Sequence, residues 1–352
     1  MKVSCFFRGL IVGFMVMAWM GKGAVAGDFS RFHMPVSNPV YNGDPRNITM
    51  VRPIYLYQRL SDKIEPTSGV KALLKQKLGV DKIPLDGHVN GFALQLSYAF
   101  NERLSFVAVK DGYIDCKLDG GALDWDDHSG WADLAAGFQY SFLHRPEEDF
   151  IATARLVFEL PTGSDDVFQE NGDGNIAPSL LILKGVEALQ LNAAIGLVVP
   201  IDSNEENTLF YDSWHLSYAV TNWFRPLVEL NHFYVLKSGD RDLEDALGKA
   251  TVQALGSLDG ATIANALHAT SKTDKWDDLV AAVASFSGGD LINLGGKDND
   301  ESRNLVTLAV GARFRPLNWL DLGVIYEFPL TDEEESLIES RFMIDAMITI
   351  NF

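Results

Sequence analysis

Residues 342–352, at the end of the chain, alternate between apolar and mostly polar side chains. Because successive side chains of a β-strand point to opposite faces, this period of two predicts a strand with one apolar face. The apolar positions are Phe342, Ile344, Ala346, Ile348, Ile350 and Phe352. An apolar face that ends on an aromatic residue indicates a wall in contact with lipid. It also predicts that the barrel-assembly machinery recognises the strand ending in Phe352.

The first residues of the chain have the features of a secretory signal peptide. Lys2 and Arg8 precede a short apolar run, and small residues at 24–26 predict cleavage before Gly27. We therefore expect residues 1–26 to be removed. The alternative is a retained anchor helix, but the run is shorter than the roughly 20 residues that such a helix needs.

Composition narrows the class of protein further. The net charge of −19 disfavours nucleic acid as a partner, because phosphates would repel the chain. Cys116 is the single cysteine left after the predicted cleavage, so no intrachain disulfide is expected. No later segment is long and apolar enough to be predicted as a spanning helix. The mean hydropathy of +0.02 is what alternating strands produce, since their two faces average out.

Twelve segments have strand character, with lengths near the roughly 9–11 residues that a tilted membrane strand requires. The expected strands are about 51–58, 89–100, 104–113, 131–143, 150–160, 175–184, 189–199, 212–221, 224–235, 304–315, 319–328 and 340–352. Short connections follow the even-numbered strands and long ones follow the odd-numbered strands. A soluble β-sandwich gives no reason for sorting its loops by length, whereas an outer-membrane barrel has short periplasmic turns and long extracellular loops.

The chain is therefore predicted to be all-β, an antiparallel transmembrane β-barrel of about twelve strands in the bacterial outer membrane, with residues 51–352 forming the barrel. Its long loops are acidic, which predicts a solvated rim; bridging of divalent cations to lipid head groups is the alternative. Apolar residues at helical spacing predict helices within the long loop 236–303 and within the first long loop, around Val70 to Leu78.

Polar residues on the other strand faces are predicted to line the lumen and any transport path. They are Arg155, Glu159, His215, Glu229, Asn231, Arg313, Asp321, Glu327, Arg341 and Asp345. Centring each hairpin on its turn predicts that Arg313 lies opposite Asp321 and that Glu327 lies opposite Arg341. Opposite charges across neighbouring strands attract each other. These pairs fit either a lumen filled by side chains or a selective path.

Residues 27–50 precede the first predicted strand and contain Pro35, Pro39 and Pro45. Proline interrupts strand pairing, so this segment is not expected in the wall. We hypothesise that this segment, which contains the charged residues Arg31, Asp44 and Arg46, enters the lumen as a plug. A periplasmic tail is the alternative.

The chain resembles the phenol-degradation MetA-pathway family of outer-membrane channels. The resemblance is carried by the stretch Pro39 to Arg46 leading into Val51 to Ile54, by Glu159 to Gly163, and by Asp290 to Gly295. It implies a barrel related in concept to hydrocarbon and fatty-acid uptake channels, and hydrophobic or aromatic cargo.

We therefore expect a channel for passive or facilitated uptake or export of small molecules, with outer-membrane lipid and the solute as partners. The alternatives are a structural or adhesive barrel with a filled lumen, and an outer-membrane hydrolase. For a hydrolase, His215 and Ser217 share a strand face near Glu229. We expect no enzymatic activity, no cofactor and no metal, since the chain has no phosphate loop, paired metal-ligand motif or nucleophile elbow.

Overall fold

A computed structural model of the chain describes residues 29–64, 83–84, 87–118, 128–164, 167, 169, 173–203, 206–237, 304–331 and 338–350. The predicted signal peptide, the predicted loop helices and Phe352 lie outside the described residues. Among the described residues no helix is long and apolar enough to cross a membrane.

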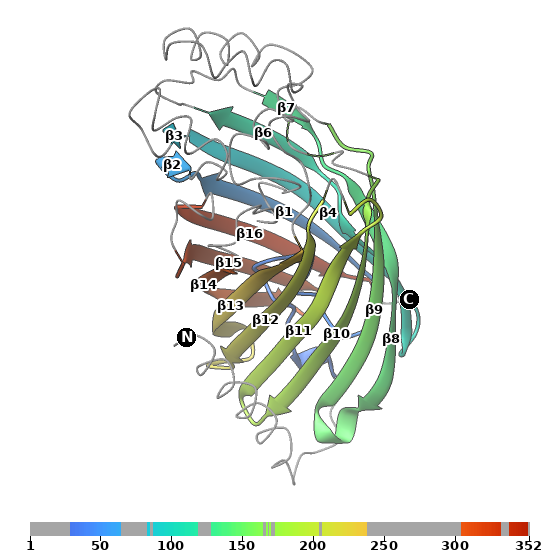
Figure 1. Ribbon diagram of the computed structural model, residues 1–352. Coiled ribbons are helices and arrows are strands. Elements are labelled where there is room, and N and C mark those ends of the chain that lie inside the picture. Colours follow the sequence, from blue (N-terminus) through green and yellow to red (C-terminus); the bar gives the residue numbers. More distant parts are fainter. Residues whose placement is uncertain are drawn as a thin grey trace, which may run out of the picture.

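The described chain is almost entirely β-structure (Figure 1). The first half of the wall contains β1 (Met50–Arg59), β4 (Gly87–Asn101), β5 (Leu104–Lys110), β6 (Tyr113–Leu118), β7 (His128–Trp131), β8 (Leu134–Arg145) and β9 (Phe150–Leu160). The second half contains β10 (Asn175–Val186), β11 (Leu189–Pro200), β12 (Thr208–Tyr218), β13 (Phe224–Lys237), β14 (Asn304–Leu317), β15 (Leu320–Pro329) and β16 (Ser340–Thr349). Smaller elements are the ribbon β2 (Lys63–Ile64) with β3 (Ile83–Pro84), and the 3₁₀ turns η1 (Phe29–Arg31) and η2 (Pro146–Glu148).

Neighbouring strands pair antiparallel around a closed ring of 12 strands. Closure occurs at β1, where Met50 pairs with Thr349 of β16 on one side and with Ser97 of β4 on the other. In Figure 1 the blue β1 accordingly lies between the red β16 and the teal β4. Closing the ring pairs the long strands of the described wall on both sides, which is what a sheet needs in order to cross a bilayer, and the short β7 pairs with β6. The predicted fold class is confirmed.

Two of the predicted strands are each divided into two pieces, which corrects the uninterrupted spans expected at 104–113 and 131–143. The first division separates β5 from β6 at Asp111 and Gly112. Gly112 has φ +139°, and a Cβ placed there would lie 2.3 Å from the backbone oxygen of Phe92. Asp111 Oδ1 accepts a hydrogen bond of 2.7 Å from the backbone N–H of Leu94. At the break between β5 and β6, the Asp111 carboxylate thus accepts the backbone hydrogen bond of Leu94 in place of a strand carbonyl.

The outer face of the wall is apolar around the barrel. On β4 the exposed side chains are Phe92, Leu94, Leu96, Tyr98 and Phe100, and on β8 they are Leu134, Phe138, Tyr140 and Phe142. Trp223 and Trp319 are exposed at the rim that carries short turns. Exposed apolar strands bordered by aromatic residues are typical of a barrel in lipid, and the short turns mark that rim as periplasmic.

The inward faces carry the buried polar side chains of the wall, such as Arg52, Gln95, Glu229 and Arg313. The register of one predicted pair is wrong. Arg313 lies opposite Gly323, not Asp321, because the hairpin is not centred on Leu317 as expected: Leu317 pairs with Leu320. A one-residue shift between Phe314 and Leu317 then places Gly323 and not Val324 opposite Arg313. The second pair is correct, since Glu327 lies opposite Arg341.

Candidate functional site

The segment 29–49 lies inside the barrel and is bonded to inward-facing side chains of the wall. Most of its residues from Phe32 to Arg46 are buried. Three prolines keep its backbone out of the sheet, so its carbonyl and N–H groups need other partners. The blue trace inside the barrel in Figure 1 is this segment. Its contacts with the wall define the candidate site.

An arginine clamp holds the segment at Pro35. Arg52 of β1 and Arg313 of β14 each donate to the Pro35 carbonyl oxygen, at 3.1 and 2.9 Å. Both guanidinium groups also bind Asp345 of β16, with Arg52 Nε–Oδ2 at 2.6 Å and Arg313 Nη2–Oδ2 at 2.8 Å. All three side chains are fully buried. The carboxylate therefore orients two cations toward one backbone carbonyl.

Glu229 of β13 anchors the next two residues of the segment. Its carboxylate accepts hydrogen bonds from the backbone N–H groups of Val36, at 2.9 Å, and Ser37, at 2.6 Å. The Ser37 hydroxyl donates to the same carboxylate. His215 Nδ1 lies 2.6 Å from Glu229 Oε1 on the wall side. A buried carboxylate with several donors holds a backbone firmly, because charge-assisted hydrogen bonds are stronger than neutral ones.

Side chains of the opposite wall bind the tip of the segment. Arg155 of β9 donates to the carbonyl oxygens of Val40 and Tyr41, both at 3.0 Å. Gln139 of β8 donates to the carbonyl oxygen of Arg46 at 3.0 Å. Inside the segment, Arg46 binds Asp44, with Nε–Oδ1 at 2.9 Å. Wall strands on both sides thus hold the segment across the lumen.

The periplasmic end of the segment carries a cluster of charges. His33 Nδ1 lies 3.2 Å from Asp321 of β15, and Arg315 Nε donates to the same carboxylate at 2.6 Å. Arg31, at the mouth, binds Asp149. Burial lowers the pKa of His33 to about 3, although Asp321 works in the opposite direction. His33 is therefore neutral at the pH of the periplasm.

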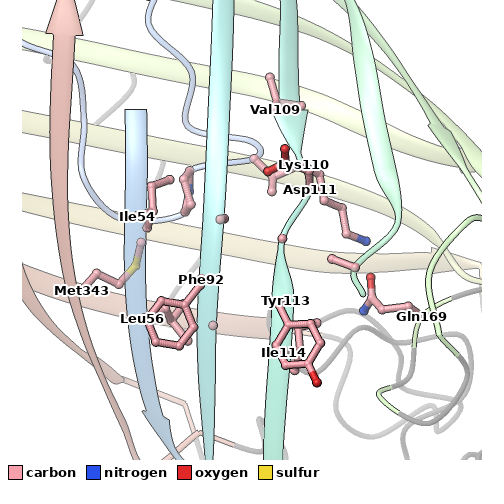
Figure 2. A pocket seen from close by; sticks show the side chains of 16 residues that line it. Ile54, Leu56, Phe92, Val109, Lys110, Asp111, Tyr113, Ile114, Gln169 and Met343 are labelled. Carbon is pink, nitrogen blue, oxygen red and sulfur yellow. The ribbon is translucent and has the colours of Figure 1, made fainter. Parts of the chain in front are cut away.

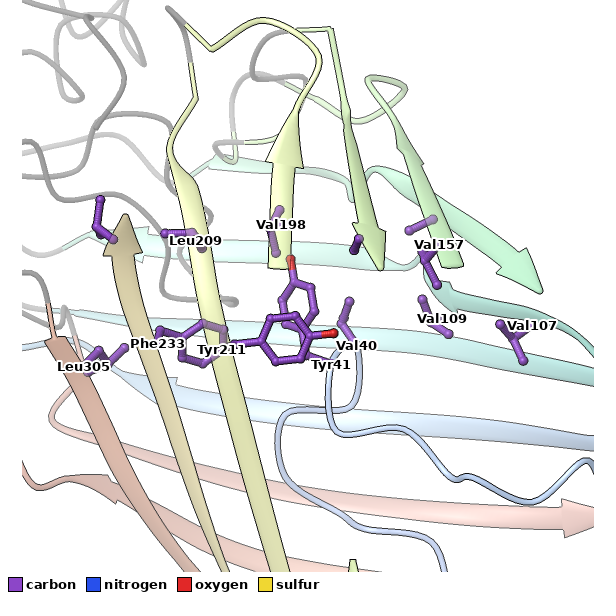
Figure 3. Packing of buried hydrophobic residues seen from close by; sticks show 13 residues of the cluster. Val40, Tyr41, Val107, Val109, Val157, Val198, Leu209, Tyr211, Phe233 and Leu305 are labelled. Atoms are coloured by element: carbon purple, nitrogen blue, oxygen red, sulfur yellow. The ribbon is translucent and has the colours of Figure 1, made fainter. Parts of the chain in front are cut away.

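The upper part of the lumen is apolar and aromatic. Tyr41, from the tip of the segment, packs on Tyr211 of β12 with ring centroids 4.7 Å apart and on Phe233 of β13 at 5.8 Å (Figure 3). The other members of this cluster are Val40, Val107, Val109, Ala135, Val157, Ala177, Val198, Leu209, Val235 and Leu305. An apolar molecule moving through the barrel would contact this surface on the extracellular side of the segment.

A cavity of about 60 Å³ lies between the segment and the divided part of the wall. Its lining is mostly apolar, with Pro39 and Val40 from the segment and Ile54, Leu56 and Met343 from the wall (Figure 2). Phe92 and Tyr113, which are exposed on the outer face, also line it. The cavity therefore adjoins the position where β5 gives way to β6.

All ten residues predicted to line the lumen are buried and belong to inward-facing positions. They do not form one site. Arg313, Asp345, His215, Glu229 and Asn231 surround the segment near Pro35 to Asn38, whereas Glu159 lies apart and binds Lys110 at 2.8 Å. Glu327 binds Arg341 at 3.3 Å. A passage of solute along these residues stays a prediction.

Several residues of the site were missed by sequence reasoning, among them Arg52, Lys110, Gln95 and Gln139. Each is a polar residue at an inward position of its strand, and this was the available signal. Lys110 was obscured because the strand 104–113 has no cleanly apolar face. Arg52 was obscured because it follows directly on the proline-rich segment.

The residues considered for hydrolysis do lie together. His215 Nε2 is 3.0 Å from Ser217 Oγ, and His215 Nδ1 faces Glu229. All three side chains are buried beneath the N-terminal segment, and Glu229 is already occupied by three donors from Val36 and Ser37. This arrangement favours anchoring of the segment over activation of the serine.

A closed, even-numbered antiparallel barrel with an apolar outer face defines an outer-membrane β-barrel, and this fold places the protein in the bacterial outer membrane. No sequence profile of a known family and no curated protein matches the chain.

Solved structures do match. The COG4313 outer membrane channel from Pseudomonas putida F1 superposes with a TM-score of 0.52 at 12% identity, over 93% of this chain and 100% of that chain. The NanC porin superposes with a TM-score of 0.42 at 6% identity, over 86% and 100%. The KdgM porin has a TM-score of 0.38 at 10% identity, over 85% and 99%. At these identities the similarity shows the fold alone.

Proposed function

We propose that the protein is an outer-membrane channel whose N-terminal segment is a plug, and that it passes small hydrophobic or aromatic molecules by passive or facilitated movement. The observation that carries the proposal is the set of charged anchors on both walls. Arg52, Arg313 and Glu229 bind the backbone of the segment, so its docking depends on a few polar contacts that can be broken and re-formed.

The chemistry of the cargo is supported by the surfaces beside the plug. The cavity at Ile54, Leu56 and Met343 is apolar, and the cluster around Tyr41 and Tyr211 offers aromatic faces. Apolar molecules gain free energy on leaving water for such surfaces, by roughly 25 cal/mol per Å² buried. The resemblance to phenol-degradation channels agrees with this class of cargo. A polar sugar would find few matching groups in the cavity.

The plug also supports a channel over a structural barrel. A barrel that only needs a filled lumen gains little from fully buried cations, because taking charges out of water costs free energy that their pairing only partly restores. Apolar side chains would fill the same space. A segment held by ion pairs and backbone hydrogen bonds, by contrast, has a defined docked position that it can leave.

Binding of naphthalene to the mature protein in neutral detergent tests the cargo class. The cavity of about 60 Å³ is smaller than naphthalene, so the ring must displace Pro39 and Val40 of the plug in order to bind. We expect saturable binding that Ala93→Trp weakens at least tenfold, because Ala93 lines the cavity and an indole would fill it. Ala154→Trp, on the exposed outer face of β9, is the matched control and is expected to bind as the parent does. Equal binding by both variants would overturn the assignment of this cavity to cargo.

A further inference from the structure

Arg225, the second residue of β13, is a buried cation without a bonded partner. Its side chain points into the barrel at the periplasmic end, and the residue is 6% exposed. Its Nε is buried without a hydrogen-bond partner, and Arg225 forms no hydrogen bond or ion pair with any part of the chain that the structure describes. The buried Nε therefore carries the cost of desolvation without a compensating hydrogen bond.

The charged groups around Arg225 do not neutralise its positive charge. Arg315, Arg31 and Arg46 all repel its guanidinium group, and Asp321 is the acid that attracts it. Each neighbouring arginine already has its own carboxylate: Arg31 binds Asp149, Arg46 binds Asp44, and Arg315 binds Asp321. The residue opposite Arg225 in the ladder is another arginine, Arg313. One positive charge is therefore not balanced by a partner acid.

A second group near Arg225 also has an unused polar atom. His33 is 1% exposed, and its Nε2 has no hydrogen-bond partner among the described residues, although its Nδ1 faces Asp321. Arg225 acts electrostatically on this ring. The neutral ring donates Nδ1–H to Asp321, so its Nε2 is an acceptor and not a donor. Buried polar atoms in native proteins are nearly all paired, so the unpaired Nε of Arg225 indicates a missing acceptor.

We propose that Arg225, with Arg315 beside it, forms a binding site for a small oxyanion, a carboxylate or a phosphate, at the periplasmic mouth of the barrel. Guanidinium groups bind both anions through paired N–H donors. The site lies on the periplasmic side of the plug and does not depend on the proposed cargo. It suits either the acid group of a solute leaving the lumen or a free anion of the periplasm.

Calorimetric titration of the mature protein in neutral detergent, at constant ionic strength, tests the site with benzoate and with inorganic phosphate in separate experiments. We expect saturable binding of at least one of them, weakened tenfold or more in Arg225→Gln. The matched control is Arg145→Gln, an exposed arginine paired with Glu148 on the turn η2, which should bind as the parent does. Binding of benzoate alone would assign the site to organic acids, and binding of phosphate alone would assign it to free anions.

Thermal unfolding gives a second readout that does not depend on the strength of binding. Without added anion, Arg225→Gln should unfold at the same or a higher temperature than the parent, because it removes an unbalanced charge. The bound anion should raise the unfolding temperature of the parent and not of the variant. Arg225→Lys keeps the positive charge but lacks the paired N–H donors of a guanidinium group, so it should bind the anion more weakly than the parent does. The absence of saturable binding in the parent, or equal binding in Arg225→Gln, would overturn the proposal.

Discussion

Arg52 on β1 and Arg313 on β14, from the same part of the wall, donate hydrogen bonds to one backbone carbonyl, that of Pro35. Asp345 lies between the two guanidinium groups and binds both. Proline has no N–H to donate to a strand ladder, and its carbonyl here accepts from two side chains of the wall. The clamp thus fixes inside the barrel a segment that does not join the wall.

Weakening the clamp should open the barrel. In Arg313→Gln the Pro35 carbonyl loses one charged donor, and Asp345 keeps Arg52 as its partner. Loss of a charged hydrogen bond costs about 1.5–3 kcal/mol, which corresponds to a tenfold or greater rise in the undocked population. Single-channel recording should show more frequent or larger open events. Arg145→Gln, at the exposed η2 turn, should leave the records unchanged.

Loss of the Ser37 hydroxyl should have a smaller effect of the same sign. Ser37→Ala removes one donor to Glu229 but keeps the two backbone N–H groups that the carboxylate also accepts. We expect docking to weaken by about 1 kcal/mol, roughly a fivefold change in population. Protease protection of the N-terminal segment would measure it. A loss as large as that of Arg313→Gln would contradict the ranking of the two anchors.

Acidification should loosen the plug through His33. Burial lowers the pKa of this imidazole from 6.5 to about 3 in the docked segment. The undocked segment therefore binds a proton at a higher pH than the docked one, and docking is fully stable above pH 6.5. Between pH 6.5 and 5 it should lose about 2 kcal/mol, at about 1.4 kcal/mol per pH unit.

Open probability measured from pH 7 to pH 5 checks this effect. His33→Gln cannot take up the proton and should show a much flatter dependence. A parent protein whose open probability stays constant over this range would show that His33 does not limit docking.

Gly43 at the tip of the plug has no room for a side chain. A Cβ there would lie 2.3 Å from Arg155 Nη1 and 3.2 Å from Leu181 Cδ1. Gly43→Val should therefore push Arg155 away from the Val40 and Tyr41 carbonyls, at a cost of about 1–3 kcal/mol. We expect a more protease-sensitive segment in a barrel that still resists heat in detergent gels. Full protection of the segment would contradict the packing at this tip.

Alternation in the sequence was enough to predict the wall, since a lipid-facing side chain and a lumen-facing side chain must follow each other along every strand. The residues 150–160 were predicted with the bounds that β9 has. The pairing of Glu327 with Arg341 followed from a regular hairpin.

The features that the alternation could not predict are those in which the strand pairing departs locally from a regular ladder. The turn after β14 lies further along the chain than expected, with Leu317 paired with Leu320, so Arg313 faces Gly323 and not Asp321. No residue there indicates the one-residue shift between Phe314 and Leu317. The division at Asp111 and Gly112 requires a positive φ and a carboxylate acting on the neighbouring strand. The clamp on Pro35 joins residues that are far apart in the chain, and such contacts have no local signal.

The plug itself is tested most directly by single-channel conductance of the refolded mature protein in a planar bilayer, with and without residues 28–48. Heat-modified mobility in gels would establish that both forms are folded barrels. We expect the intact protein to show small or rare conductance steps and the shortened protein to show larger ones. Shortened barrels that are folded but conduct less than the intact protein, or not at all, would contradict it.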